Sequence, residues 1–352
     1  MSALVICDNE PIDFSMLESV RRLSADLKKA ARELNRTDAR FLVDRYYQVQ
    51  DDRIRDAAQI RSAEAEPNAL IDWTKNANEL YENSVRRALG EFSKTYNVGQ
   101  WLQSITGIGP VISAGLLAHL DIRRCPTYGH FWRFAGLDPT MKWHSSERVE
   151  SVMKEVLGSE KIQEGSLIEI CQKLGRLPDR IKEQMEKFKK NWKNKADLKK
   201  ELCRRPWNAK LKTLLVFKLG ESFVKVQNNK SDFYGHYFRQ QKDALIAKND
   251  RGELAQSAQD ALEAKNYSRE TIAKQCYSQG KLPPAHIHAR ARRWTVKLFV
   301  SHLHGVMYRD YFEQDPPVPY ALEKAEGDHR HYIAPPNYPF TLAGRSLKDM
   351  KD

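Results

Sequence analysis

The 352-residue sequence contains few cysteines, and no two of them form a Cys-x-x-Cys pair. An odd, scattered set (Cys7, Cys125, Cys171, Cys203, Cys276) argues against a disulfide framework and a cysteine zinc site. Long apolar runs are also missing, since none approaches the roughly 18 residues that a membrane helix needs. The first eleven residues lack the basic start and long apolar core of a secretory signal. We therefore expect a cytoplasmic protein with no membrane partner.

The sequence also lacks the alternating apolar runs of β-strands. Between residues 13 and 96, apolar residues instead recur every three or four positions, which predicts long amphipathic helices. Thr37 is the expected N-cap of the second of these helices, and its apolar positions include Phe41, Tyr46 and Ile54. Such a stripe is usually a packing face, and its length resembles a helical hairpin or short coiled coil. We expect homo-oligomers to form through these N-terminal helices.

The whole chain is predicted to be all-α, with an extended C-terminal tail that is rich in proline. Five regions follow from the pattern: an N-terminal helical or coiled-coil region (1–96), a helix-hairpin-helix core (97–146), a basic helical insertion (147–206), a C-terminal helical part (207–312) and the Pro-rich tail (313–352).

Positive charge exceeds negative charge, with 58 Lys plus Arg against 46 Asp plus Glu and a net charge of +12. A polyanionic partner is therefore favoured. Between Arg180 and Arg205, eleven basic residues stand against four acidic ones, interleaved with Phe188 and Trp192. A second basic run, Arg290 to Lys297, surrounds Trp294. Clusters of this kind give salt-sensitive, sequence-blind affinity for phosphates, although a solvated helix face has the same composition.

The most informative stretch is Trp101 to Leu120, in which Gly107-Ile108-Gly109-Pro110 separates two apolar helical segments. Glycines permit a tight turn with positive φ, and proline suits the first position of the second helix. The unpaired N–H groups at that helix start form a ready site for a phosphate. The pattern thus predicts a helix-hairpin-helix that grips the DNA backbone without reading bases, or else a plain helix–helix turn.

This stretch, together with Phe131-Trp-Arg-Phe-Ala-Gly136-Leu137-Asp-Pro139, resembles the C-terminal domain of the DEDD-type, bridge-RNA-guided insertion-sequence transposases. The resemblance spans residues 70–310 and is sharp over 101–139. It implies that the helices at 14–96 correspond to the family's coiled coil. It also implies that the helix from Trp207 to Phe223 corresponds to a basic helix that follows the hairpin.

Two departures from the family's pattern affect its chemistry. The family's RNase H-like domain, with four metal-binding acids on a sheet, has no counterpart in this helical N-terminus. We therefore expect no cofactor, and Mg²⁺ only where a separate acidic domain supplies its ligands. The family's nucleophilic serine would correspond to Ser145 or Ser146, but no glycine follows and both could simply cap a helix. The histidines (His286, His288, His302, His304, His329, His331) are poorly spaced for one metal, so no metal site is predicted.

These observations favour a sequence-tolerant DNA-binding protein of transposase or recombinase type, associated with the nucleoid and acting on a mobile or viral element. It would bind duplex or branched DNA. The candidate contact residues are Thr106, Gly107, Ile108, Gly109, Val111, Lys142, Lys189, Lys190, Lys193, Lys210, Lys212, Arg290, Arg292 and Arg293. Two alternatives stay open: an active transposase with Ser145 or Ser146 as nucleophile, and an RNA-binding protein, because basic helices also suit A-form RNA. Whether the chain is an enzyme is not decided by its sequence.

Overall fold

The computed structural model describes residues 23–63, 68–229, 232–264, 267, 269–317, 333–339 and 343–352. Within these ranges the chain forms helices and no strand, so the predicted all-α fold is confirmed. The described residues contain one isolated bridge, between Tyr96 and Arg345. No helix among them is long and apolar enough to cross a membrane.

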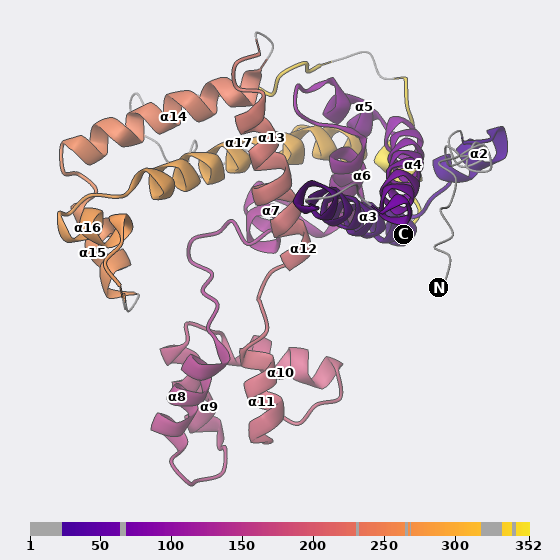
Figure 1. The fold of residues 1–352 in the computed structure, drawn as a ribbon. Coiled ribbons are helices and arrows are strands. Elements are labelled where there is room, and N and C mark those ends of the chain that lie inside the picture. The colour runs from indigo at the N-terminus through magenta and orange to yellow at the C-terminus, as the bar shows by residue number, and fades with distance from the viewer. Residues whose placement is uncertain are drawn as a thin grey trace, which may run out of the picture.

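Two long antiparallel helices, α3 and α4, lie side by side near the N-terminus (Figure 1). The first three described helices are α2 (Ala25–Arg32), α3 (Arg36–Ser62) and α4 (Ala69–Lys94). Asn35, rather than the expected Thr37, caps α3, because its side chain accepts a hydrogen bond from the backbone N–H of Asp38. The inward face of α3 consists of Ala39, Val43, Tyr46 and Val49, whereas Phe41 and Ile54 are exposed.

The centre of the molecule is α6, a ten-residue helix in which nearly every side chain is buried. It packs against α3 and α4 on one side and against the helical segment that follows Asn208 on the other. At Gly115 that segment comes so close that an added Cβ would lie 2.7 Å from Leu214 Cδ2. Helix α6 comprises Pro110–His119. It follows α5 (Asn97–Ser104) and precedes the 3₁₀ turn η2 (Ile122–Arg124) and α7 (Tyr128–Phe134).

A second layer completes the main core, in which the 29-residue helix α17 packs along α14, α13 and α7 (Figure 1). Its inner residues, such as Phe299 and Leu303, join the same hydrophobic cluster as α5 and α6. The elements are α12 (Ala209–Lys212), the π-helical η3 (Thr213–Leu219), α13 (Gly220–Lys225), α14 (Phe233–Asp250), α15 (Ala255–Glu263), α16 (Ile272–Ser278) and α17 (Pro284–Phe312).

The segment between α7 and α12 folds around a hydrophobic cluster of its own. It comprises α8 (Ser146–Leu157), α9 (Glu164–Lys173), α10 (Pro178–Lys187) and α11 (Lys195–Leu202). Figure 1 shows this four-helix unit set apart from the other helices and joined to them by two chain segments. We call it the inserted unit.

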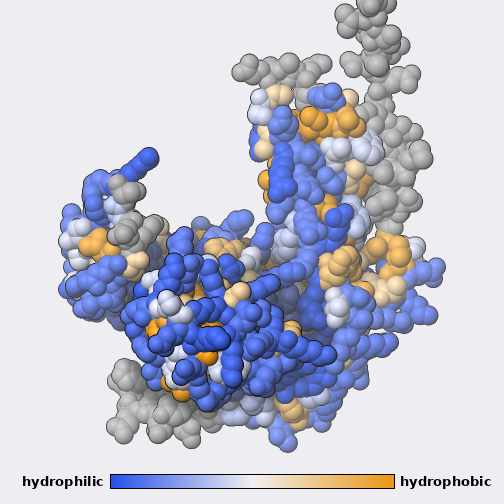
Figure 2. Space-filling model, turned by 90° about the horizontal axis from the view of Figure 1, so that it is seen from below, coloured by the Kyte–Doolittle hydropathy of each residue, from blue (hydrophilic) through white to orange (hydrophobic). Residues whose placement is uncertain are grey.

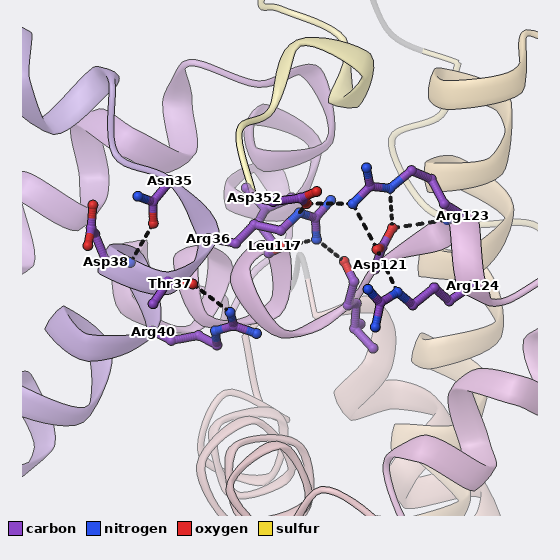
Figure 3. A network of polar contacts seen from close by, with 11 residues as sticks. Asn35, Arg36, Thr37, Asp38, Arg40, Leu117, Asp121, Arg123, Arg124 and Asp352 are labelled. Carbon is purple, nitrogen blue, oxygen red and sulfur yellow. Dashed lines mark hydrogen bonds and ion pairs between the residues drawn. The ribbon is translucent and has the colours of Figure 1, made fainter. Parts of the chain in front are cut away.

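The C-terminal segments lie against the main core, and their helix is the short η5 (Leu347–Asp349). The side chain of Arg36, from the start of α3, donates to the carbonyl oxygens of Leu117 and Leu120 at the end of α6 (Figure 3). Asp352 lies 3.7 Å from the Arg36 guanidinium and also pairs with Arg123. The C-terminal end of α6 is therefore held by a network of charged side chains.

Candidate nucleic-acid interface

Helices α5 and α6 are joined by a tight turn over residues 105–109, which we call the glycine turn. Gly107 has φ +93°, a conformation that L side chains rarely adopt. Its carbonyl oxygen accepts a hydrogen bond of 2.5 Å from Ser222 Oγ of α13. Ile108 is buried at 5% exposure, and the N–H of Ile108 donates to Ile105 O. The turn is thus held by the hydrogen bond from Ser222 of α13 and by the buried side chain of Ile108.

Only part of the glycine turn faces outward. Thr106, Gly107 and Gly109 are half-buried, whereas the side chains of Ile108 and Val111 belong to the core. Gly109 is the N-cap of α6, and no side chain of the described residues caps this helix start. Of the five residues predicted here for DNA contact, Ile108 and Val111 can therefore act only by positioning the backbone.

Basic residues of α2 and α4 lie beside the start of α6. A cavity of about 430 Å³ is lined there by Pro110, Glu91 and a set of cations that we call the hairpin cluster: Lys28, Arg86, Arg87 and Lys94. All four are exposed. Glu91 already pairs with Arg32 across α2 and α4. The positive end of α6 therefore adjoins exposed cations, an arrangement suited to an anion.

A second basic site surrounds the loop 136–141, within the segment that carries the Gly-Leu-Asp-Pro sequence. Gly136, with φ +66°, lies under the Trp207 ring, and an added Cβ would come within 2.6 Å of that ring. A cavity of about 540 Å³ beside the loop is lined by four cations that we call the loop cluster: Lys212, Arg290, Arg293 and Lys297. Asp138, the carboxylate that lines this cavity, lies 3.6 Å from Arg133.

The cations of the loop cluster lie close enough to repel one another. Burial lowers the pKa of Lys212, and the charges of Arg293 and Arg205 lower it further. Burial also lowers the pKa of Lys297; the charge of Asp138 opposes this effect and that of Arg293 adds to it. Indole rings partly compensate, since Lys212 Nζ lies 4.1 Å from the Trp207 centroid and Lys297 Nζ 5.1 Å from that of Trp132. Asp138 is the one carboxylate among the described lining residues, so four cations face one carboxylate and the site favours an external anion.

The inserted unit adds a third set of cations where it meets the main core. A cavity of about 500 Å³ shares Met141 with the previous one. It is lined by the junction cluster: Arg133, Lys142, Arg176, Arg180, Arg204 and Arg205. Arg176 donates to the carbonyl oxygens of Leu202 and Arg204, and its Nε is buried without a partner among the described residues. Viewed from the side of the inserted unit, the surface is predominantly hydrophilic (Figure 2).

The structure therefore brings together Lys142, Lys212, Arg290 and Arg293 of the predicted contact residues. Sequence reasoning did not include Arg180, Arg133, Arg176, Arg204 and Arg205 of the junction cluster among the candidate contact residues. The signal for the last two was present in the basic stretch that ends at Arg205, whereas Arg133 and Arg176 are isolated in the sequence.

Other predicted contacts have different environments. Lys210 forms an ion pair with Asp44, and Arg292 pairs with Glu221. Three lysines of the inserted unit, Lys189, Lys190 and Lys193, line neither cavity. Lys190 lies 3.8 Å from Glu201, and Lys193 lies over the Trp192 ring.

The two candidate nucleophiles lie at the start of the inserted unit. Ser145 is the N-cap of α8, and its Oγ accepts a 3.3 Å hydrogen bond from the N–H of Arg148. Ser146 is the first helical residue and is exposed. His144 Nε2 is 3.0 Å from the carbonyl oxygen of Leu174, so this nitrogen donates to α9 and is not a base for either hydroxyl.

Four of the histidines have protein partners. His302 bonds to Tyr234 and to Ile333 O, and His304 Nε2 bonds to Cys125 O. His286 bonds to Tyr277, and His288 packs against the Phe238 ring. In the described ranges no group of three or more His, Cys, Asp or Glu side chains could hold a metal ion. His329 and His331 lie outside these ranges.

The comparison with protein families agrees with the resemblance found in the sequence. Residues 99–153, about a sixth of the chain, match the family described as "Transposase IS116/IS110/IS902 family". The matched segment is consistent with a transposase domain of that family, and it contains the glycine turn, the loop 136–141 and Ser145. No curated protein and no solved structure matches the chain.

Proposed function

We propose that this chain is a sequence-tolerant DNA-binding protein of transposase or recombinase type, used in transposition or recombination of a mobile or viral element. The transposase domain supports a role on DNA. The observation that carries the binding mode is the loop cluster, in which Lys212, Arg290, Arg293 and Lys297 share one cavity with Asp138. Holding four like charges together costs free energy that a phosphate backbone would offset.

The three basic clusters suggest how a duplex is held. The cavities of the loop and junction clusters share Met141, so the two clusters adjoin each other, and the junction cavity also takes in residues of the inserted unit. The hairpin cluster lies at the N-terminal end of α6, whereas Asn208 contacts His119 at its C-terminal end. Asn208 also lines the junction cavity, so the junction cluster adjoins the C-terminal end of α6. Since a helix rises 1.5 Å per residue, the hairpin and junction clusters are separated by roughly the 15 Å length of α6. In this proposal they grip phosphates at two places without reading bases.

Fluorescence anisotropy with a labelled duplex of about 30 base pairs, titrated across salt concentrations, tests this assignment. The double variant Lys212→Gln/Arg293→Gln should bind about tenfold more weakly for each cation removed. It should also lower the slope of log affinity against log salt by about two. The same slope change is expected for Arg86→Gln/Lys94→Gln in the hairpin cluster.

The matched control is Lys189→Gln/Lys193→Gln, which removes two exposed cations that line neither cavity. It should leave the affinity and the salt slope nearly unchanged. If the control weakens binding as much as the loop variant, net charge alone explains DNA binding and the assignment of the clusters is wrong.

A further inference from the structure

A cavity of about 810 Å³ opens beside the glycine turn, between Thr106, the junction of α13 with α14, and the C-terminal segment at Asn337. Its volume lies in the range of small-molecule and nucleotide sites. Unlike those of the three basic clusters, the described lining residues of this cavity carry no excess of positive charge. The one carboxylate among its lining residues, Asp232, is bonded at 3.0 Å to the one guanidinium, that of Arg239.

Carboxamides dominate the polar part of this cavity. Gln227, Asn228 and Asn229 come from the turn that follows α13, and Asn337 comes from the opposite wall. A carboxamide carries a donor and an acceptor side by side, and Gln227 and Asn228 bring such groups to this wall. This pairing matches the edges of nucleobases, as in the bidentate contacts of Asn and Gln with adenine.

Aromatic rings form the adjoining wall on α14. Tyr237 stands edge-on to Phe233 at 5.1 Å and to His236 at 5.6 Å, measured between ring centroids. His236 is exposed, whereas Phe233 and Tyr237 are partly buried. Rings at the mouth of a cavity provide faces on which an unstacked base can stack. The Arg239 guanidinium, held by Asp232, adds a planar group to the same wall.

The opposite wall is held in place by hydrogen bonds to the transposase domain. Asn337 Nδ2 donates to the carbonyl oxygen of Ser104 at 2.9 Å, and Trp101 Nε1 donates to Pro336 O at 2.8 Å. Ser104 ends α5, directly before the glycine turn. The cavity therefore keeps a fixed position relative to the backbone that is proposed to grip DNA.

We propose that this cavity binds the base of an unpaired nucleotide of the DNA held by the glycine turn, with carboxamides reading its edge and the α14 rings stacking on its face. The inference rests on the proposed function. A duplex cannot present a base edge and both faces of the base at once, so the nucleotide must be bulged, flipped or single-stranded.

The experiment compares two labelled duplexes of identical sequence, one fully paired and one with a single unpaired 2-aminopurine. The wild-type chain should bind the bulged duplex about tenfold more tightly, as stacking of one base on an aromatic ring allows. 2-Aminopurine fluorescence should fall on binding as the base stacks. His236→Ala/Asn228→Ala should reduce the preference to less than about twofold and leave affinity for the paired duplex unchanged. Both residues are exposed, so this variant should fold.

Gln240→Ala is the matched control, because Gln240 is an exposed residue of α14 that does not line the cavity. It should retain the full preference. Equal binding of the two duplexes by the wild-type chain, or a preference that survives His236→Ala/Asn228→Ala, would overturn the inference and leave the proposed function standing. Failure to bind the paired duplex would instead count against the proposed function. Tighter binding of the same bulge in RNA would overturn the assignment to DNA.

Discussion

The two ends of α6 are held in different ways. At its N-terminal end, the positive φ of Gly107 and the hydrogen bond from Ser222 fix the backbone. At its C-terminal end, distant side chains hold the helix: Arg36 donates to two carbonyl oxygens, and Asn208 bonds to His119. The first arrangement is local apart from Ser222, and a short motif in the sequence predicts it. The second joins residues more than 80 positions apart, which no local pattern shows.

The largest effect is expected where the backbone itself is constrained. Gly107→Ala should lower the free energy of unfolding by about 3 kcal/mol, because alanine resists this φ. The new Cβ would also lie 3.2 Å from Ser222 Oγ and Val226 Cγ2. Gly109→Ala is the matched change: Gly109 has φ −90°, and nothing lies within 4 Å of an added Cβ. Its cost should stay at about 1 kcal/mol, because alanine is a poorer N-cap than glycine but meets no steric conflict here. Urea unfolding measures both, and equal losses would contradict this account of the turn.

At the other end of α6 the expected effect is pH-dependent. Burial is the main cause that lowers the pKa of His119 to about 4. Asn208 Oδ1 accepts from the N–H of Leu211, so its amide nitrogen faces His119 Nδ1 and donates to it. A protonated ring would place two donors against each other. The folded state therefore disfavours the imidazolium.

The direction follows from the lowered pKa. In the unfolded chain His119 binds a proton near pH 6.5, whereas in the folded chain His119 binds it only near pH 4. The contribution of His119 to stability is complete well above pH 6.5 and should fall by about 3 kcal/mol as the pH drops to 4. His119→Gln should remove this share of the acid loss, measured as the free energy of unfolding against pH. An unchanged slope in the variant would show that His119 does not carry it; His302, whose pKa burial also lowers to about 4, would retain its own share.

Composition and periodicity were enough to predict an all-helical chain, because apolar spacing is a local property. The phase of one helix was not predictable in this way. Phe41 is 67% exposed and Ile54 50% exposed, although both belong to the predicted stripe of α3. The buried stripe is Ala39, Val43, Tyr46 and Val49, in which alanine gave a weak signal. The prediction followed the large residues Phe41 and Ile54, whereas the small residue Ala39 is the one that packs against the neighbouring helices.

The basic surface was predictable only where cations are also neighbours in the sequence. Arg290 and Arg293 stand one turn apart on α17 and meet Lys212 in one cavity. The charge run could not reveal that Lys210, two positions earlier, turns to Asp44. Arg133 of α7 and Arg176, which lies between α9 and α10, line the same cavity although they are far apart in the sequence. Tertiary placement therefore decides which cations are neutralised and which remain for a partner.

The smallest effect separates a helix cap from a nucleophile at the start of the inserted unit. Ser145→Ala removes the acceptor for the Arg148 N–H, so α8 should lose about 1 kcal/mol of stability. Ser146→Ala is the matched control, since Ser146 is exposed at the first helical position, where alanine is tolerated. Hydrogen exchange of the α8 amides would detect the difference, and both variants should keep the salt slope of DNA binding. A covalent serine–DNA adduct that forms on supercoiled DNA and disappears in Ser145→Ala would show that this hydroxyl leaves its capping position to react, and the chain would then be an enzyme rather than a binding protein.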